Sequence, residues 1–408
     1  MTEKKNIPQG YKDSPLGIIP KEWEVKRLGD IADITSGTTP LRANREYYNN
    51  GVIPWVKTTD LNNGTLYETE EKVSKEAVEK TSLKILPKGT VLVAMYGGFR
   101  QIGRTALLGI DATINQALSA LMCKSSVESP FVLAWLNCRV NYWKRLAASS
   151  RKDPNITGNE VAKFPILIPS KEEQGCIVEV LGLWDTAIEK QSELIEKLKL
   201  RKRALMQQLL TGKKRLFGFS GEWKDVKLGD VFDERSETKR DDLPLLSITG
   251  DKGVIYQSDS DKRDISNDDK SKYKRICPKD IGYNTMRMWQ GRSALSELEG
   301  IVSPAYTIVT PRESVNVKFM SMLIQQPRVV YDFWTHSQGL VSDTLNCKYP
   351  DFCQVKVRIP TKQEQTAIAS VLVKADKEIE LAKEKLASLQ SQKRGLMQQL
   401  LTGKKRIN

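Results

Sequence analysis

The chain contains the same eleven-residue segment twice. LMQQLLTGKKR occupies residues 205–215 and, letter for letter, residues 396–406. An identity of this length indicates an internal duplication, which is the first feature to establish in any sequence. The same offset of 191 extends upstream, because residues 169–215 and 360–406 match at 25 of 47 positions. The fold therefore has to contain one structural unit twice.

The start of the repeated unit also recurs, whereas its middle does not. EWEVKRLGDI at residues 22–31 is echoed by EWKDVKLGDV at residues 222–231. Each unit begins with Trp-x-x-x-x-Leu-Gly-Asp, continues through a dissimilar middle, and ends with Ile-Pro-x-Lys-x-Glu-Gln and a helical segment. A molecule with two copies of one frame and a different insert in each is expected to recognise two different features at a fixed separation.

The bulk composition is that of a globular protein with a basic surface. The 408 residues are 39% hydrophobic and 28% charged, which predicts two or more domains with ordinary cores. A net charge of +14 favours an anionic partner, most simply nucleic acid, although a solvated basic surface gives the same composition. The N-terminus has no apolar signal segment and no stretch approaches a membrane span, so we expect a cytoplasmic protein.

Cysteine and histidine usage argues against a metal centre. The chain has one histidine, His336, and no C-x-x-C pair, so a structural zinc site is not expected. In a reducing cytosol, the thiols are expected to be buried small hydrophobes or inert groups. They are Cys123, Cys138, Cys176, Cys277, Cys347 and Cys353.

The pattern divides the chain into four segments. The first and third are globular domains with short strands and many turns, and the second and fourth are long helices. Their predicted bounds are 1–165, 166–216, 217–356 and 357–408.

Within the domains, local signals predict a few elements. Val91–Met95 is predicted to be a strand, and Ser129–Ala148 one helix with Ser129 as its N-cap. In the second domain, the charge runs at residues 233–242 and 258–275 predict solvated loops, and the apolar half of Gly300–Val309 predicts a strand.

Both long helices have defined start signals. Ser170 predicts the N-cap of the first, and Glu173 completes a capping box. Thr361 and Glu364 repeat this arrangement in the second, and Gly212 is predicted to end the first.

Apolar residues follow heptad spacing along both helices, with Lys202 and Lys393 interrupting at corresponding positions. This predicts an antiparallel two-stranded coiled coil within the chain, although each stripe could instead pack on its own domain. About 40 helical residues at 1.5 Å each give a spacer of roughly 60 Å at most. We therefore expect an α+β protein in which two mixed α/β domains, related by a pseudo-two-fold axis, are separated by two long helices. The predicted coiled-coil residues are Leu181, Trp184, Ile188, Ile195, Leu198 and Leu205, with Leu372, Ile379, Leu386, Leu389 and Leu396.

A catalytic constellation is missing from the sequence. Neither a phosphate-binding G-x-x-x-x-G-K-[ST] loop nor a G-x-S-x-G elbow occurs, and one histidine nearly excludes histidine-based acid–base catalysis. The segment Ser303–Tyr306 resembles the Asn/Asp-Pro-Pro-Tyr signature of amino-methyltransferases. Its second proline is alanine and no glycine-rich cofactor loop precedes it, so we interpret it as the start of a strand. A stand-alone methyltransferase or nuclease with a degenerate site remains the enzymatic alternative.

Four features together resemble the specificity (S) subunit of type I restriction-modification systems. They are the Trp-x-x-x-x-Leu-Gly-Asp motif followed by IADITSGTTP, IPWVKTTDL at residues 53–61, the two Ile-Pro-x-Lys-x-Glu-Gln motifs, and the repeated LMQQLLTGKKR. The resemblance covers essentially the whole chain. It implies two target-recognition domains, each reading one half of a bipartite, asymmetric double-stranded DNA target, and two conserved helices between them.

The resemblance also implies partners that carry the chemistry. Two modification (M) subunits bind S-adenosylmethionine and methylate adenine, and restriction (R) subunits use ATP and Mg. The S subunit itself is then non-catalytic and binds no cofactor, which agrees with the absence of catalytic motifs.

Candidate DNA-binding residues are chosen by chemistry, because Arg, Lys, Asn, Gln, Ser and Thr read base edges. The loops around Arg100 and Arg287 are the strongest candidates, since both are basic, flank glycine and follow similar turns at Pro87 and Pro278. For any single residue, an exposed or turn-forming side chain is the simpler interpretation. The candidates are Lys57, Thr58, Thr59, Asn62, Tyr96, Arg100, Gln101, Arg104, Asn115, Gln116, Arg151 and Lys152 in the first domain. In the second domain they are Ser247, Thr249, Lys252, Asn284, Met286, Arg287, Arg292, Ser303 and Tyr306.

The long helices have a second predicted role. Their outward faces, with Gln174, Gln207, Gln365 and Gln398, are predicted to dock M subunits, with solvent exposure as the alternative. The identity of the two LMQQLLTGKKR copies favours either one partner met twice or mutual packing. A scaffold whose basic surface serves only protein contacts is the remaining alternative function.

Overall fold

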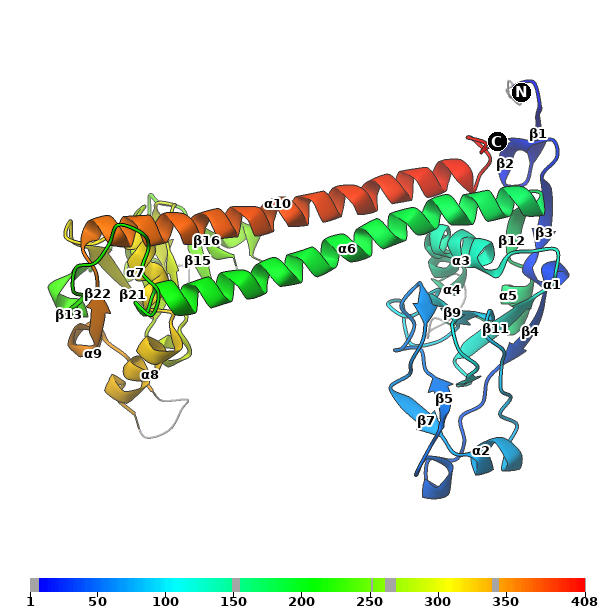
Figure 1. Cartoon of the computed structure of the whole chain (residues 1–408), viewed down its shortest axis with the longest axis horizontal. Coiled ribbons are helices and arrows are strands. Elements are labelled where there is room, and N and C mark those ends of the chain that lie inside the picture. The colour runs from blue at the N-terminus through cyan, green and yellow to red at the C-terminus, as the bar shows by residue number, and fades with distance from the viewer. Residues whose placement is uncertain (1–6, 149–154, 251, 261–268, 340–344, 408) are drawn as a thin grey trace. The chain divides into compact units, whose positions relative to one another are not determined.

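The computed structural model describes residues 7–148, 155–250, 252–260, 269–339 and 345–407. The chain divides into two compact units. Unit 1 comprises Met1–Gln191 with Lys385–Asn408, and unit 2 comprises Ser192–Glu384. Each unit therefore contains one globular domain and a part of each of two long helices (Figure 1).

The domain of unit 1 mixes short strands with short helices. Its strands are β1 (Tyr11–Ser14), β2 (Gly17–Pro20), β3 (Glu24–Arg27), β4 (Ala32–Ser36), β5 (Ile53–Val56), β6 (Thr65–Leu66), β7 (Glu71–Val73), β8 (Val91–Ala94), β9 (Thr105–Leu108), β10 (Thr113–Ile114), β11 (Leu118–Cys123) and β12 (Pro165–Ile168). Its helices are α1 (Leu28–Ile31), the 3-10 helix η1 (Arg45–Tyr47), α2 (Lys75–Lys80), α3 (Ser129–Cys138), α4 (Val140–Ala148) and α5 (Gly158–Ala162). The long helix α6 (Lys171–Leu209) follows.

The domain of unit 2 has a similar order of elements. Its strands are β13 (Lys224–Lys227), β14 (Phe232–Glu234), β15 (Leu246–Thr249), β16 (Gly253–Tyr256), β17 (Lys274–Ile276), β18 (Ile281–Asn284), β19 (Ser293–Leu295), β20 (Gly300–Val302), β21 (Tyr306–Pro311) and β22 (Lys356–Ile359). Its helices are η2 (Leu228–Asp230), η3 (Gln257–Asp259), η4 (Met288–Gln290), α7 (Val317–Leu323), α8 (Pro327–His336) and α9 (Tyr349–Gln354). The long helix α10 (Lys362–Leu400) follows.

The two domains contain the same central sheet although their middle sequences differ. In unit 1 the strand order is β4-β11-β8-β9-β6, and in unit 2 it is β14-β21-β18-β19. The strand predicted at Val91–Met95 is confirmed as β8, whose four residues are all buried. The loop from β8 to β9 and the loop from β18 to β19 therefore occupy corresponding positions in the two sheets.

The recurring ends of the repeat meet in space within each unit. Strand β3, from the Trp-x-x-x-x-Leu-Gly-Asp motif, pairs antiparallel with β12, which leads into α6. Strand β13 pairs in the same way with β22, which leads into α10. The two ends recur together because they form one two-stranded sheet at the start of each long helix.

The antiparallel coiled coil is confirmed. Helices α6 and α10 lie side by side and run in opposite directions (Figure 1). Of the predicted apolar stripe, Leu181, Ile195, Leu372 and Ile379 are buried, and the other predicted positions are half-buried. Each helix passes from one unit into the other, and the pairing continues inside each unit.

The lysines that interrupt the stripes form ion pairs across the helix pair. Lys202 Nζ lies 2.5 Å from Asp376 in unit 2, and Lys393 pairs with Asp185 in unit 1. Each residue of one pair lies 191 positions from its counterpart in the other, so the sequence repeat extends to the ion pairs. Because both pairs are partly exposed, each contributes about 0.2–1 kcal/mol.

The identical LMQQLLTGKKR copies pack into the domain cores. Leu400 and Leu401 join the core of unit 1, and Leu209 and Leu210 join the core of unit 2. Gly403 follows with a φ of +70°, and a Cβ there would lie 2.4 Å from Pro20 Cδ. Packing of each copy against the frame of one unit therefore accounts for the identity at these buried leucines.

The predicted capping boxes are wrong in their second half. Ser170 Oγ accepts from the Glu173 N–H at 3.2 Å, as an N-cap should. The Glu173 carboxylate does not return to the cap. It accepts from Trp23 Nε1 at 3.0 Å and from Arg406 Nε at 2.6 Å. A buried carboxylate gains more from a charged donor and an indole N–H than from the backbone of its own cap.

The second helix start repeats this arrangement. Glu364 is buried and accepts from Arg215 Nε at 2.6 Å and from Arg215 Nη2 at 2.7 Å. Thr361 Oγ1 accepts from the Glu364 N–H at 3.4 Å. In each unit, the last arginine of one LMQQLLTGKKR copy therefore holds the first turn of the other long helix.

The prediction that Gln174 and Gln365 face outward is also wrong. Both are buried, and each amide joins a long helix to its domain. Gln174 Oε1 accepts from the Glu128 N–H at 2.9 Å, and Gln365 Oε1 accepts from the Asn316 N–H at 2.8 Å. Such an amide satisfies backbone groups that would otherwise be buried without partners. Only the other two predicted positions, Gln207 and Gln398, are exposed.

The helix predicted at Ser129–Ala148 is in fact two helices, α3 and α4, with the break at Arg139. The N-cap of α3 is Glu128 rather than Ser129. At the break, Arg139 has a φ of −113°, and its guanidinium lies 4.7 Å from the ring centroid of Trp135. The contact between Arg139 and Trp135 therefore competes with continuation of the helix. Apolar spacing alone does not predict this break.

Candidate nucleic-acid interface

Three loops of the first domain come together at the ends of its strands. β5 and β10 are parallel neighbours, so the chain leaves both on the same side, at Lys57 and Asn115. The loop from β8 to β9 lies beside the loop after β5. A Cβ on Gly97 would lie 3.8 Å from Thr58 Oγ1, and Arg104 donates a hydrogen bond to the loop after β5. Predicted residues from separate parts of the sequence therefore lie on neighbouring loops.

Some of the basic groups in these loops are already paired. Lys57 Nζ lies 2.7 Å from Glu71, and this hydrogen bond raises the pKa of the lysine. Arg104 Nη1 donates to Gln101 Oε1 at 2.8 Å. Arg100 is exposed, and its guanidinium makes no ion pair or hydrogen bond with the residues that the structure describes. Arg100 is therefore the cation of this loop that is available to a ligand.

Arg100 lines a hollow of about 470 Å³ together with two residues that the sequence did not single out, Asn63 and Lys144. Lys144 lies on α4, far from the loop in sequence, and is exposed. Only the fold brings it beside Arg100. The position of Lys144 on the polar face of a short amphipathic helix is the one sequence signal that could have indicated this residue.

The predicted amides of the first domain shape its turns. Asn62 Oδ1 accepts from the Gly64 N–H at 2.9 Å, and Asn115 Oδ1 accepts from the Ala117 N–H at 3.2 Å. These side-chain bonds stabilise the loop backbone. The other candidates differ in exposure: Thr59, Tyr96 and Gln116 are exposed, and Thr58 and Gln101 are half-buried. Arg151 and Lys152 lie outside the described residues.

Six of the nine predicted residues of the second domain line one cavity of about 700 Å³, and Ser247, Met286 and Ser303 do not. Three elements form it: the hairpin of β15 and β16, the loop from β18 to β19, and the start of β21. The lining residues are Ile248, Thr249, Gly250, Lys252, Ile255, Ser260, Asn284, Arg287, Arg292 and Tyr306. Ile248, Gly250, Ile255 and Ser260 were not predicted. The alternating apolar positions of a short hairpin are the signal that could have indicated the two isoleucines.

The segment that resembles a methyltransferase signature forms the turn between β20 and β21. Ser303 O accepts from the Tyr306 N–H at 3.0 Å, and Ser303 Oγ accepts from the Ala305 N–H at 3.4 Å. Tyr306 Oη donates to Ile248 O at 3.3 Å, which ties this turn to the β15–β16 hairpin. The predicted strand start is confirmed. Two other predicted residues, Ser247 and Met286, are half-buried and exposed respectively.

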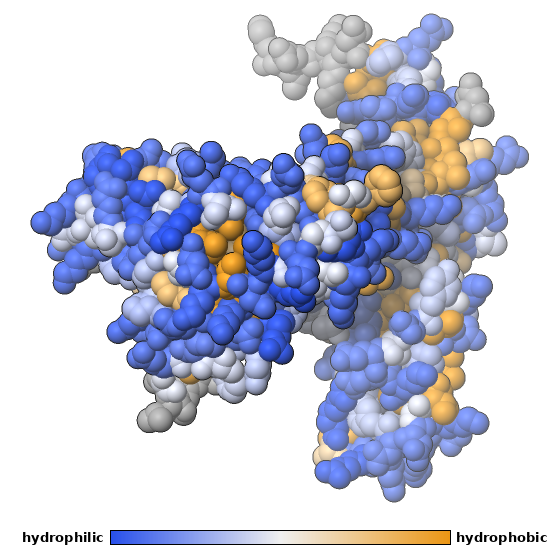
Figure 2. All heavy atoms as spheres, turned by 60° about the vertical axis from the view of Figure 1, so that its left-hand side comes forward, coloured by the Kyte–Doolittle hydropathy of each residue, from blue (hydrophilic) through white to orange (hydrophobic). Residues whose placement is uncertain are grey.

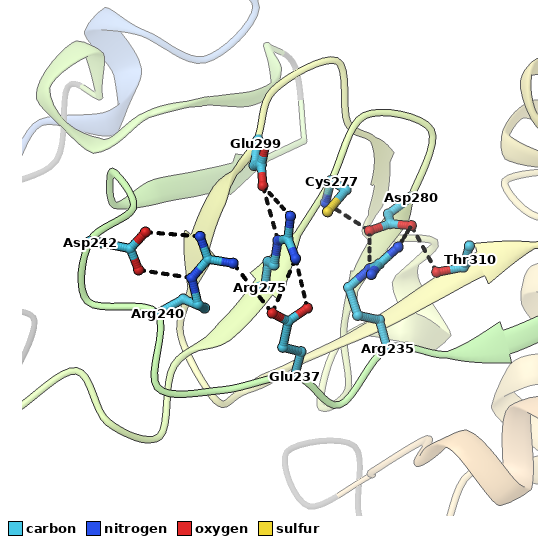
Figure 3. A network of polar contacts seen from close by, with 9 residues as sticks. All are labelled: Arg235, Glu237, Arg240, Asp242, Arg275, Cys277, Asp280, Glu299 and Thr310. Atoms are coloured by element: carbon cyan, nitrogen blue, oxygen red, sulfur yellow. Dashed lines mark hydrogen bonds and ion pairs between the residues drawn. The ribbon is translucent and has the colours of Figure 1, made fainter.

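Other arginines of the second domain belong to a network of ion pairs (Figure 3). Arg275 bonds to Glu237 at 2.9 Å and also pairs with Glu299, and these hydrogen bonds raise its pKa. Arg235 bonds to the buried Asp280 at 2.6 Å. The charge run predicted as a solvated loop at residues 233–242 thus supplies partners for arginines. These guanidiniums brace the domain and are not available to a ligand without loss of the network.

Hydrophilic residues cover most of the face seen in Figure 2, and hydrophobic residues gather in smaller areas. Exposed apolar side chains nonetheless occur in the two corresponding loops. Tyr96 and Phe99 lie in the loop from β8 to β9, and Met286 lies in the loop from β18 to β19. Apolar contact with a thymine methyl or with sugar is chemistry that such side chains supply.

The described residues offer little other site chemistry. They contain no group of three or more His, Cys, Asp or Glu that could hold a metal ion. The six cysteines are free thiols, and burial raises the pKa of Cys347 to about 12. Every helix in the described ranges is too short or too polar to span a bilayer.

Comparison with known proteins agrees with this geometry. Residues 20–200 match the family described as "Type I restriction modification DNA specificity domain". The type I restriction enzyme MjaIX specificity subunit of Methanocaldococcus jannaschii is 33% identical over 198 residues, which are 47% of this chain and 45% of that protein. The chain thus spans about half the length of this relative. The putative MjaX specificity subunit of the same organism is 22% identical over 436 residues, covering 98% of this chain and 97% of that protein.

Solved structures share the fold over nearly the whole chain. The type I restriction-modification S subunit from M. genitalium has a TM-score of 0.54 at 14% identity and covers 98% of each chain. The HsdS subunit from Thermoanaerobacter tengcongensis has a TM-score of 0.51 at 16% identity, covering 94% of this chain and 98% of that one.

Proposed function

We propose that the chain, which is similar to type I restriction-modification specificity subunits, selects the DNA target for a methyltransferase and endonuclease complex without catalysing either reaction. The observation that carries this proposal is the pair of unlike loop clusters at corresponding positions of two matching sheets. A duplicated frame supports two readers, and different inserts give them different chemistry. The DNA target of the chain is then bipartite and asymmetric.

The chemistry of the two clusters fits DNA better than another protein partner. Each cluster presents an exposed arginine, Arg100 or Arg287, that is unpaired among the described residues and can neutralise phosphate or read a base edge. Amides and exposed apolar side chains lie beside the arginines. A net charge of +14 supplies the long-range attraction to the duplex.

We assign the helix pair two roles in the complex. Helices α6 and α10 have 39 residues each, which is roughly 60 Å at 1.5 Å per residue, and they set the gap between the two half-sites. Their exposed faces, including Gln207 and Gln398, dock two M subunits that carry S-adenosylmethionine. R subunits, which use ATP and Mg, join the same assembly.

The proposal is tested by mapping methylated adenines after expression of the chain with its M subunits in a host without other methyltransferases. The expected result is one asymmetric motif of two half-sites with a fixed gap. Charge removal by Arg100→Ala should alter one half-site, and Arg287→Ala the other. Arg328→Ala, which removes the same charge from an exposed position of α8 outside both loop clusters and the long helices, is the matched control and should leave the motif intact.

Two results would contradict the proposal. Methyl transfer to DNA by the purified chain alone would make it an enzyme. Methylation by the complex without sequence preference, or with a motif insensitive to both arginines, would make it a scaffold. Binding should also weaken as salt rises, because phosphate contacts release counterions.

A further inference from the structure

The cavity of the second domain is lined by two arginines that are unpaired among the described residues and that lie on a loop with a fixed backbone. Arg287 and Arg292 are both exposed and both line it. Within the described part of the chain, neither guanidinium makes an ion pair or a side-chain hydrogen bond. The arginines of Figure 3, in contrast, are paired with carboxylates. Two exposed guanidiniums at one cavity offer charged donors that suit an anionic or acceptor-rich ligand.

Asn284, a further polar residue that lines the cavity, also supplies a donor. Asn284 Oδ1 accepts from the Met286 N–H at 3.0 Å, which fixes the orientation of the amide and leaves its NH₂ for the cavity. No Asp or Glu is among the lining residues that the structure describes. Among the described lining residues, the side-chain nitrogens of Asn284, Arg287 and Arg292 are thus hydrogen-bond donors toward a ligand.

The loop that carries the arginines is held in place before any ligand binds. Gly291 adopts a φ of +73°, and a Cβ there would lie 3.0 Å from Val330 of α8. Trp289 Nε1 donates to Met286 O at 3.0 Å, and Gln325 Nε2 donates to Ser293 O at 2.8 Å. A preorganised loop loses little conformational entropy on binding, so its side chains can discriminate between similar ligands.

Resting on the DNA-reading function proposed above, we propose that this cavity reads a guanine in the half-site of the second domain, through Arg287 and Arg292. The major-groove edge of guanine offers two acceptors, O6 and N7, and the arginine fork matches both. Adenine and cytosine present an amino donor at that edge, which would meet further donors and stay unsatisfied.

Phosphate is also an acceptor, but the cavity walls favour a base. Ile248, Ile255 and the ring of Tyr306 supply apolar surface beside the guanidiniums. Base edges and methyl groups can use such surface, whereas a phosphate would lose hydration against it.

The corresponding loop of the first domain lacks this chemistry. Arg104 donates to Gln101 and to Leu61 O. Of the two arginines in that loop, Arg100 alone is therefore unpaired among the described residues. The guanine assignment therefore applies to one half-site, and the two readers differ in chemistry as well as in sequence.

The test uses the full chain assembled with its M subunits and measures methylation of oligonucleotides that carry all four bases at each position of both half-sites. For the native complex, we expect one position of one half-site to prefer guanine by about ten-fold or more. Arg287→Lys and Arg292→Lys keep the charge and remove the fork, so each should reduce this preference to about two-fold and leave the other half-site unchanged. Arg328→Lys, on an exposed arginine outside the cavity, is the matched control.

The possible outcomes separate the two proposals. If the native complex shows no sequence preference, the DNA-reading function itself fails. If the native preference is bipartite but the Lys variants keep it, the guanine assignment is overturned. If Arg287→Ala instead weakens binding to all sequences equally and lowers the salt dependence by about one ion, the arginine binds phosphate and the assignment is also overturned. Retained reading of the other half-site shows that a variant is folded.

Discussion

The carboxylate of Glu173 should be the most sensitive single group at the junction of helix and domain in unit 1. Glu173 is 7% exposed and accepts three hydrogen bonds. One comes from Trp23 Nε1 at 3.0 Å, and two come from Arg406, through Nε at 2.6 Å and Nη2 at 3.0 Å. Glu173→Gln keeps the shape but removes the charge and turns an NH₂ group toward a donor.

The magnitude follows from these bonds and from the exposure of the arginine. A hydrogen bond to a charged group is worth about 1.5–3 kcal/mol when buried. The Arg406 side chain is 38% exposed, so solvent offsets part of the loss. We expect Glu173→Gln to lower the free energy of unfolding by about 1–3 kcal/mol, which shifts the thermal midpoint of a unit of this size by about 2–4 °C per kcal/mol.

Differential scanning calorimetry of the full chain measures this shift. Glu172→Gln, at the exposed neighbouring position, removes the same charge and should change the midpoint little. Glu364→Gln should act in unit 2 and more weakly, because Glu364 binds Arg215 but has no bond to Trp223 Nε1, which is unpaired among the described residues. Equal midpoints for Glu173→Gln and Glu172→Gln would refute the reasoning.

Three further predictions concern backbone and charge. Gly403→Ala should destabilise unit 1 by about 1–3 kcal/mol in urea unfolding, because Gly403 has a φ of +70° and its Cβ would meet Pro20; unchanged stability would contradict this. Gly395→Ala, inside α10 with open space around it, should instead stabilise the chain by about 0.4–1 kcal/mol in the same assay. Hydrogen bonds from Arg42 and Lys57 lower the pKa of Glu71 below its ordinary 4.5, so this stability is present above pH 4.5 and is lost as pH falls through the folded-state pKa. Comparing unfolding free energies at pH 3 to 6, Glu71→Gln should show the shallower decline, and parallel curves would contradict it.

The sequence predicted the frame because the frame depends on periodic and repeated features. The heptad stripes, the helix starts and the strand at β8 all follow from local spacing, and the structure has them. The partners of Glu173 and Gln174 could not be predicted in the same way. Each finds its partner more than 40 positions away, as with Glu128 and Arg406, and no local pattern encodes such a pairing.

The candidate site was also predictable from the sequence only in part. Chemistry and turn signals placed Arg100 and Arg287 in corresponding loops, and the two sheets have those loops in corresponding positions. The same reasoning could not tell an unpaired cation from a paired one. Lys57 resembles Arg100 as a basic loop residue, yet Glu71 neutralises it across two strands.

The way the proposed reading loops are held is compatible with one frame that serves different targets. In the loop from β18 to β19, the anchoring bonds are largely made by backbone groups: the Thr285 N–H donates to Ala305 O at 3.1 Å, and Thr285 O accepts from the Cys347 N–H at 2.9 Å. Arg287 and Arg292 contribute no side-chain bond to this anchoring within the described residues. Their side chains can therefore change without loss of the loop conformation, whereas the frame carboxylates Glu173 and Glu364 cannot change without cost. Specificity can then vary at the loop positions while stability stays fixed by the repeated frame, which is the division of labour that a duplicated sequence with unlike middles requires.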